Sequence, residues 1–329
     1  MRILFLSTWF PYPPDNGSKI RAFHLLRALS KSHQVTLVAF QPTNSNHDSQ
    51  FLISELNISN IYPVREDPFR YVNIPQAFKF GSPIPVAYWS HKLMRETVAE
   101  VINSSQWEAV VAVQTQVARY AMEVPGLSQI LDIDTSLSYQ LHEQRFTQDG
   151  HKGRLRNWVS WQKAKQYETR LFRRFPACTV VSSVELNYIK SMVSASECRV
   201  EVSPNGVDCQ HHRPGLTQPR PKALVYNGAI TYSANYDAMQ YFLAELYPLI
   251  QRRESDVSLT ITGSTSGIEL TGLALDKSVR LSGYVDDIRI PVSEAAVCVV
   301  PIRQGGGTRL KILEAMALGT PVVLSLIHI

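Results

Sequence analysis

Short apolar runs alternate with longer stretches of helical spacing along the first part of the chain. The opening run Arg2–Thr8 predicts a buried strand, Gly17–Ser30 carries apolar residues at helical spacing, and Gln34–Phe40 predicts the next strand. Strands that alternate with helices predict a parallel sheet covered on both faces. Further runs of strand length, separated by segments of helical length, are Ala109–Val113, Gln129–Ile133, Cys178–Ser182 and Arg199–Val202.

The same alternation restarts after a polar segment with three prolines at 211–222. We therefore predict a domain over residues 1–205, a linker over 206–222 and a second α/β domain over 223–323. The predicted strands of the second domain are Ala223–Tyr226, Val257–Thr262, Val279–Ser282, Val297–Pro301 and Pro321–Leu324. Its predicted helices lie near Tyr236–Gln251 and Asp287–Ala295 and at Thr308–Ala317.

Composition narrows the class of protein. The 329 residues are 44% hydrophobic and 19% charged, which excludes a disordered or fibrous chain. The net charge of +5 is too small for a nucleic-acid coat but favours acidic ligands or an anionic lipid surface. Four cysteines without metal-like spacing fit a reducing compartment. Because no apolar run approaches the roughly 18 residues of a spanning helix, we expect a cytoplasmic protein.

A proline-rich loop, Pro11–Lys19, joins the first strand to the first helix. Backbone N–H groups and the helix dipole can receive an anion at such a junction, and Gly17 would permit close approach of the backbone. An ordinary strand–helix turn explains the loop equally well. The G-x-G-x-x-G fingerprint is missing after this strand, which counts against a nicotinamide or flavin enzyme.

The strongest chemical signal is a glycine run before the last predicted helix. Gly305–Gly307 precede Thr308, a candidate N-cap, and the helix N-terminus is then open to phosphate with Arg309 and Lys311 beside it. Glu314 lies one turn deeper, where its carboxylate could accept hydrogen bonds from a ribose diol. The alternative is an exposed Lys–Glu pair at i,i+3, which stabilises a helix by about 0.2–0.5 kcal/mol.

This segment, continued by Thr320–Val323, resembles the donor-binding signature of glycosyltransferase family 4. The resemblance extends along the chain. It implies a GT-B fold, two Rossmann-like domains facing a cleft, and retaining transfer of a hexose from a nucleotide sugar, as in polysaccharide biosynthesis. The acceptor, a glycan or a lipid-linked group, would lie on the N-terminal half. The other matching segments are the loop ending at Gly17, Val181–Ser183, Pro204–Asp208, Tyr226–Ala229 and Gly283–Asp287.

By this resemblance, Arg309 and Lys311 hold the diphosphate, Glu314 holds the ribose, and the backbone at Gly17, Gly307 and Thr308 approaches the donor. No cofactor and no metal are implied. Fixed cations and helix N-termini would stabilise the charge on the departing diphosphate.

Two departures from the family pattern bear on the donor. The family has two glutamates with seven residues between them, and Gly306 stands where the first, which serves the donor sugar, is expected. The Arg and Lys often found after the first strand of the second domain are missing between Ala229 and Asn235. Arg309 and Lys311 would take over their role.

Asp132-Ile133-Asp134 resembles the D-x-D sequence that holds a metal–nucleotide complex in the other large transferase fold. In a two-domain layout, however, the pair follows a strand of the acceptor half, at the edge where ligands meet parallel sheets. Three interpretations stay open: Asp134 contacts the acceptor, Asp134 caps the next helix, or both carboxylates bind a metal. We take Asp134 on the acceptor side as the candidate catalytic residue.

The segment from Lys152 to Phe175 is rich in cations and carries Trp158 and Trp161. A basic helix with aromatic residues can lie on an anionic membrane, so peripheral contact with the inner face of the membrane is one expectation. A charge-rich helix that faces water is the other.

The final residues, Leu324–Ile329, are what CTG TCT CTT ATA CAC ATC encodes, which resembles a transposase end sequence used in sequencing libraries. We expect residues 324–329 to be an adapter artefact and the second domain to be incomplete, which would leave this chain poorly stable and inactive; a native strand tail is the alternative. Two other functional classes stay open. A nucleotide-sugar epimerase can share the architecture, and an inactive fragment or sugar-nucleotide-binding module would explain Gly306.

Overall fold

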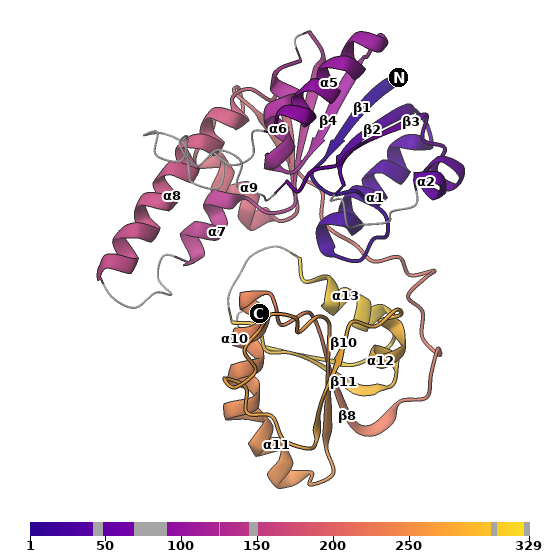
Figure 1. Ribbon diagram of the computed structural model, residues 1–329. Helices are drawn as coiled ribbons and strands as arrows, with labels where there is room; N and C mark the ends of the chain where they lie inside the picture. Colours follow the sequence, from indigo (N-terminus) through magenta and orange to yellow (C-terminus); the bar gives the residue numbers. More distant parts are fainter. Residues whose placement is uncertain (42–48, 69–90, 125, 145–150, 304–307, 326–329) are drawn as a thin grey trace. The chain divides into compact units, whose positions relative to one another are not determined.

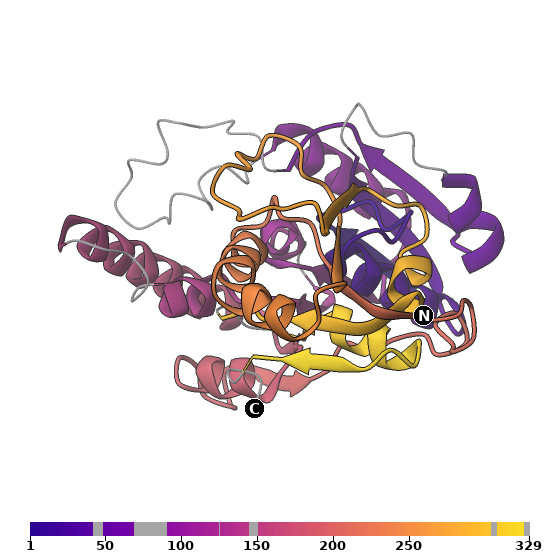
Figure 2. The ribbon, with the colours of Figure 1, turned by 90° about the horizontal axis from the view of Figure 1, so that it is seen from below.

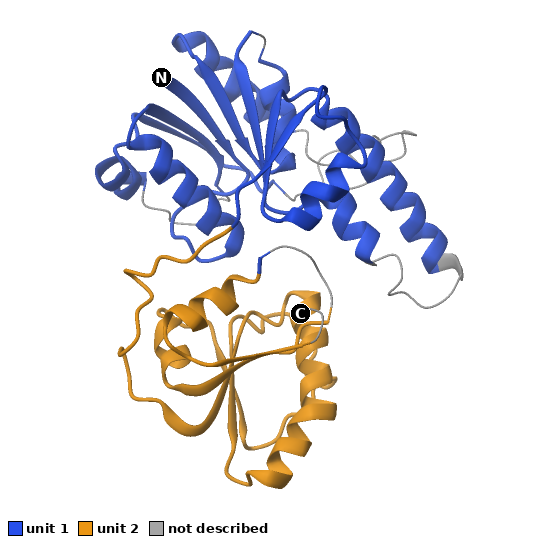
Figure 3. Cartoon of the chain, turned by 180° about the vertical axis from the view of Figure 1, so that it is seen from behind, with its two compact units in different colours: residues 1–204, 306–308 blue, residues 205–305, 309–329 orange. Residues whose placement is uncertain are grey.

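The computed structural model describes residues 1–41, 49–68, 91–124, 126–144, 151–303 and 308–325. The chain forms two compact units (Figure 3). Unit 1 comprises Met1–Pro204 with Gly306–Thr308, and unit 2 comprises Asn205–Gly305 with Arg309–Ile329. No described helix is long and apolar enough to span a bilayer.

Unit 1 is built on a seven-stranded sheet of order β3-β2-β1-β4-β5-β6-β7, in which every pairing is parallel. The predicted parallel α/β architecture is therefore confirmed for this unit. The strands are β1 (Arg2–Ser7), β2 (Gln34–Phe40), β3 (Asn60–Val64), β4 (Ala109–Val113), β5 (Ser128–Ile133), β6 (Ala177–Val180) and β7 (Arg199–Val202).

Helices cover both faces of this sheet (Figure 1). Alternate residues of β1 enter different cores, with Ile3 and Phe5 in one and Leu4 and Leu6 in the other. The first core also holds apolar side chains of α1 and α2, and the second those of α5, α6, α8 and α9. The helices are α1 (Gly17–Ser30), α2 (Ser49–Leu56), α5 (Lys92–Ser104), α6 (Thr115–Met122), α7 (Leu137–Gln144), α8 (His151–Phe172) and α9 (Ser183–Lys190).

Helices α7 and α8 pack side by side as a pair within unit 1 (Figures 1 and 2). The buried carboxylate of Glu168 on α8 holds this helix to the start of α7. It accepts hydrogen bonds from the Ser136 and Ser138 hydroxyls at 2.7 and 2.5 Å, and from the Leu137 and Ser138 amides at 2.8 and 3.0 Å. Burial raises the pKa of Glu168, while these four donors oppose the shift.

Unit 2 carries a five-stranded parallel sheet of order β10-β9-β8-β11-β12. The neighbouring residues Val225 and Tyr226 of β8 again enter different cores. Helices α12 and α13 cover the core that contains Val225, and α10 and α11 cover the core that contains Tyr226. The strands are β8 (Arg220–Asn227), β9 (Ser258–Thr262), β10 (Val279–Gly283), β11 (Ala295–Val300) and β12 (Val322–Leu324). The helices are α10 (Ser233–Tyr241), α11 (Tyr247–Arg253), α12 (Arg289–Ser293) and α13 (Leu310–Ala317).

Besides α13, whose start is described with the site, two elements of unit 2 differ from the prediction. The single helix expected near Tyr236–Gln251 consists of α10 and α11 joined by one π-helical turn, Phe242–Leu246. Pro248 lacks the N–H that an α-helical bond needs, and the wide turn lies shortly before it. Strand β8 begins at Arg220, before the predicted start at Ala223, because two charged residues and a proline hide its first residues in the hydrophobic pattern.

Candidate functional site

The Lys311 side chain reaches from the first turn of α13 to the end of β8. Its Nζ donates hydrogen bonds to the Tyr226 hydroxyl and to Asn235 Oδ1, both at 3.1 Å, and lies 4.4 Å from the centroid of the Tyr226 ring. The Tyr226 hydroxyl donates to Asn235 Oδ1 at 2.7 Å, and Asn235 Nδ2 donates to the Ala229 carbonyl at 2.8 Å. These bonds fix the ammonium beside the carboxyl end of the central strand.

Gly228, directly after β8, makes room for this ammonium. A Cβ at Gly228 would lie only 2.5 Å from Lys311 Nζ and 3.0 Å from Asn235 Nδ2. Any larger residue would therefore have to displace the lysine. The segment Ala229–Asn235 contains no Arg or Lys, and Lys311 instead supplies a cation to this edge of the sheet from α13.

Burial has a strong effect on this cation. Desolvation, and to a smaller extent the positive charge of Arg309, lowers the pKa of Lys311 to about 7. Burial also raises the pKa of the neighbouring Tyr226, so this phenol stays protonated at neutral pH. A bound anion would favour the charged ammonium, so its protonation and anion binding are coupled.

Glu314 lies almost one helical turn beyond Lys311 and has a different partner. Its Oε2 accepts a hydrogen bond from Asn227 Nδ2 at 3.0 Å. Burial raises the pKa of Glu314, while the Asn227 amide and the Lys311 charge oppose the shift. The alternative of an exposed Lys311–Glu314 pair is wrong, because both side chains are partly buried and each is bonded to residues at the end of β8 or the start of α10.

The start of α13 differs from the prediction. The helix begins at Leu310, and its N-cap is Arg309, whose side chain makes no capping hydrogen bond. Thr308 is therefore not the cap, because Arg309 (φ −83°, ψ 89°) keeps the backbone non-helical between Thr308 and the helix. Thr308 and Arg309 are both partly buried. Gly307 and the rest of 304–307 lie outside the described residues.

Gly17 and Asp134 belong to unit 1 and lie near each other. Gly17 is the exposed first residue of α1, and Asn16 before it caps the helix by accepting from the Lys19 amide at 3.0 Å. The next residue, Ser18, donates its hydroxyl to Asp134 Oδ2 at 2.5 Å. The N-terminus of α1 and the carboxyl end of β5 therefore share one polar cluster.

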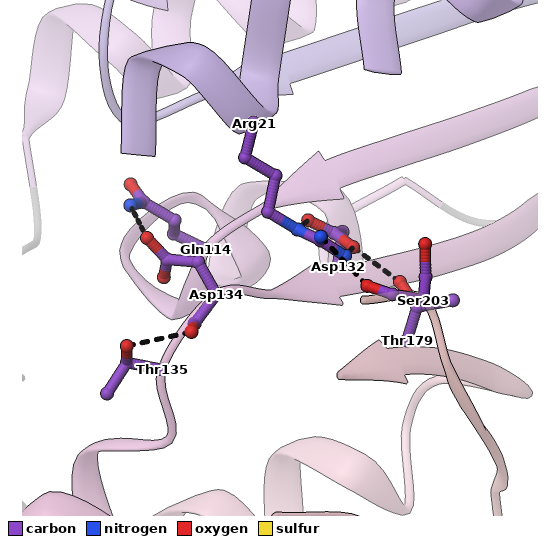
Figure 4. A network of polar contacts seen from close by, with 7 residues as sticks. All are labelled: Arg21, Gln114, Asp132, Asp134, Thr135, Thr179 and Ser203. Carbon is purple, nitrogen blue, oxygen red and sulfur yellow. Dashed lines mark hydrogen bonds and ion pairs between the residues drawn. The ribbon is translucent and has the colours of Figure 1, made fainter. Parts of the chain in front are cut away.

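Asp134 does not cap the following helix. Its Oδ2 also accepts from Gln114 Nε2 at 2.8 Å (Figure 4). The cap of α7 is Ser136, whose hydroxyl accepts from the Tyr139 amide at 3.2 Å. The capping interpretation is thus wrong, and Asp134 stands partly exposed at the carboxyl edge of the sheet.

Gln114 is a residue that the sequence analysis missed. It follows β4 directly, is 6% exposed, and adopts a positive φ of 78° that costs a non-glycine residue strain energy. Its amide nitrogen bonds Asp134, but its Oε1 is buried without a partner in the described part of the chain. The sequence did hold a signal for Gln114, because it is a polar residue directly after an all-apolar strand.

Asp132 forms a buried ion pair. Arg21 binds it with two nitrogens at 2.7 and 2.5 Å, and the Thr179 hydroxyl donates to it at 2.5 Å (Figure 4). Arg21 also donates to the Ser203 carbonyl at 2.9 Å. Since both oxygens of Asp132 are engaged in these contacts, they argue against the D-x-D metal interpretation. Among the described residues, no three His, Cys, Asp or Glu side chains are grouped to hold a metal ion.

Two protein families match the chain, one over most of unit 1 and the other over most of unit 2. Residues 15–211 match the family described as Glycosyltransferase Family 4, and residues 221–328 match Glycosyl transferases group 1. No curated protein sequence matches the chain.

Solved structures with the GT-B fold of glycosyltransferases resemble the whole chain. Anabaena Alr3699/HepE in complex with UDP-glucose is 15% identical with a TM-score of 0.63, covering 98% of this chain and 80% of that one. A mutant of S. aureus TarM in complex with Fondaparinux, alpha-GlcNAc-glycerol and UDP is 11% identical with a TM-score of 0.67, covering 98% and 85%. A glycosyltransferase from Rickettsia africae is 10% identical with a TM-score of 0.59, covering 98% and 78%.

Proposed function

The chain belongs to glycosyltransferase family 4, and from that membership we propose that it transfers a hexose from a nucleotide sugar to a glycan or lipid-linked acceptor with retention. The observation that supports this most is the place of Lys311. Its ammonium lies at the carboxyl end of the central strand of unit 2, where parallel sheets bind ligands. The structural relatives include complexes with UDP and UDP-glucose, which agrees with a nucleotide-sugar donor.

The donor contacts that we propose follow from charge and position. Lys311 and Arg309 bind the diphosphate, because two cations near one strand end match its negative charge. Glu314, held by Asn227, accepts hydrogen bonds from the ribose hydroxyls. Thr308, directly before Arg309 in the chain, adds a backbone contact to the donor.

In the proposed reaction, the bond between the anomeric carbon and the diphosphate breaks, and the diphosphate leaves with the electron pair. The acceptor oxygen forms its bond to the same face of the sugar and passes its proton to the departing diphosphate oxygen. Lys311 and Arg309 stabilise the charge that develops on the leaving group. On the acceptor side, Asp134, partly exposed at the carboxyl edge of the sheet and bonded by Gln114, offers a hydrogen-bond acceptor for a sugar hydroxyl.

Product analysis tests this function. The chain is incubated with a panel of nucleotide sugars, with and without glycan and lipid-linked acceptors, and the products are examined by NMR. We expect nucleoside diphosphate to form in step with a new glycosidic bond of the donor's anomeric configuration. An epimer formed without acceptor would assign the epimerase activity instead, and a donor that binds but is never consumed would assign a binding module.

Replacing Glu314 by alanine should weaken nucleotide binding while the protein still folds. A hydrogen bond to a charged group contributes about 1.5–3 kcal/mol, so we expect the Kd to rise roughly 10- to 150-fold. Calorimetric titration measures the change, and Glu245→Ala, on the exposed side of the π-helical turn, is the matched control. If Glu314→Ala lowers the stability of the protein and the folded variant binds the donor with unchanged affinity, Glu314 is only a structural residue.

Turnover should persist in EDTA. Lys311 and Arg309 already supply positive charge at the diphosphate, and Asp132 is occupied by Arg21. The measurement compares initial rates before and after chelation, with Mn²⁺ added back. A complete loss of activity that Mn²⁺ restores would contradict this and would indicate that Asp132 and Asp134 bind a metal needed for the reaction.

A further inference from the structure

Three apolar side chains stand exposed on the N-terminal half of α8. Leu155, Trp158 and Val159 are 63%, 50% and 38% exposed. Residues three and four apart lie on one face of a helix, so these side chains form a single apolar patch. We call this set the α8 patch.

Cations flank the α8 patch on both sides. At 3.6 residues per turn, Arg154 and Lys165 fall on one flank and Arg156 and Lys163 on the other. Arg154 and Arg156 are exposed, and the two lysines are partly buried. Six of the 22 residues of α8 are Lys or Arg, and its only acidic residue is Glu168.

The opposite face of α8 packs against the rest of unit 1. Ala164, Glu168 and Leu171 are buried there, and Trp161 donates its indole N–H to the Tyr188 hydroxyl at 2.8 Å. Glu168 therefore places no negative charge near the α8 patch. Packing of the helix explains the buried face, but it does not explain a tryptophan and two aliphatic residues in water among cations.

We propose that the α8 patch docks onto an anionic lipid surface. A helix that lies in a membrane interface has an apolar strip bordered by Lys and Arg, with tryptophan at the level of the headgroups. Cations on both flanks match a plane of negative charge, whereas a small acidic ligand would engage one flank only. With three apolar side chains the contact is weak, peripheral and salt-sensitive. This proposal goes beyond sugar transfer and does not depend on it.

Sedimentation with vesicles tests the proposal. The chain is mixed with phosphatidylcholine vesicles and with vesicles containing one quarter phosphatidylglycerol, at low salt. We expect binding to the anionic vesicles only. Arg154→Glu with Arg156→Glu should lower the partition coefficient about thirtyfold or more, because each cation near such a surface contributes about fivefold. The matched control is Arg252→Glu with Arg253→Glu, two exposed cations of α11, which should change it little.

Fluorescence tests the apolar contact separately. Brominated lipids in the anionic vesicles should quench the wild-type chain, and Trp158→Phe should lose that quenching while it still binds. Leu155→Ser should weaken binding, whereas Leu249→Ser, at a residue 53% exposed on α11, should not. Donor titration of every variant keeps the two proposals distinguishable, since donor affinity should stay unchanged.

Three results would overturn the docking proposal. They are equal sedimentation with neutral and anionic vesicles, equal loss of binding in the α8 and α11 variants, and anionic binding without quenching of Trp158. Self-association that Leu155→Ser abolishes, in place of vesicle binding, would assign the patch to a second copy of the chain.

Discussion

Replacing Lys311 by methionine is expected to remove most of the affinity for a nucleotide sugar. Methionine keeps a long apolar stem against the Tyr226 ring but loses the ammonium that we assign to the diphosphate. A charged hydrogen bond contributes up to about 3 kcal/mol, so the Kd should rise roughly 150-fold. Calorimetric titration measures it, and Lys277→Met, at an exposed lysine of unit 2, is the control. Affinity that survives in Lys311→Met would contradict the assignment.

The lowered pKa of Lys311 adds a pH dependence to the same site. The diphosphate of a nucleotide sugar does not ionise near neutrality, so the free protein must protonate Lys311 before or during binding. Because its pKa is about 7, affinity should fall as the pH rises from 7 to 9, with net uptake of a proton. Titration in two buffers of different ionisation enthalpy measures that uptake. Lys311→Arg, which stays charged, should show neither effect; the same pH response in both proteins would contradict the account.

The stability of the unliganded fold should depend on pH in the opposite sense. The unfolded chain holds the Lys311 proton up to about pH 10, whereas the folded chain releases it near pH 7. The unfolded state therefore binds more protons in this window, and the free energy of unfolding rises with pH. Lys311→Met should remove this contribution in denaturant titrations.

Replacing Asp132 by alanine is expected to cause the largest loss of stability. The substitution leaves the Arg21 guanidinium buried without its carboxylate and removes the acceptor of the Thr179 hydroxyl. Breaking one partner of a buried pair costs about 3–5 kcal/mol. The loss is measured as the change in the free energy of unfolding in denaturant, with unfolding followed by a signal from unit 1.

A double variant separates the pair from its surroundings. Arg21→Met with Asp132→Leu removes both charges together and should recover much of the stability lost in Asp132→Ala, because no buried charge is left unpaired. Two results would show that the pair contributes little to stability. They are a double variant no more stable than Asp132→Ala, and a loss in the free energy of unfolding of Asp132→Ala below about 1 kcal/mol.

The hydrophobic pattern predicted the strands of both sheets except the edge strand β3, and it placed the start of the central strand β8 three residues late. β1 and β4 are buried on both faces and read as continuous apolar runs. The edge strand β3 went unpredicted because Asn60 and Pro63 interrupt it and only Val64 is buried. Thr308 indicated the start of the last helix, but α13 begins only at Leu310 because Arg309 is non-helical.

The candidate site was predictable in its residue types but not in its contacts. The glycine run and the spacing of Lys311 and Glu314 indicated an anion site, but the partners Tyr226 and Asn227 come from a strand more than eighty residues earlier. Likewise Arg21 meets Asp132 across 111 residues. Such pairings depend on the order of strands in the sheet, which local sequence does not specify.

The most direct test of the account is a titration of the purified chain with nucleotides that differ only in their phosphates and sugar. A panel of nucleoside diphosphate sugars is compared with the matching diphosphates, monophosphates and free sugars by calorimetry. We expect one diphosphate sugar and its diphosphate to bind and the free sugar not to bind. The monophosphate should bind at least tenfold more weakly because it lacks the second phosphate at Lys311. Equal affinity for mono- and diphosphate, or no binding of any nucleoside diphosphate, would contradict the account.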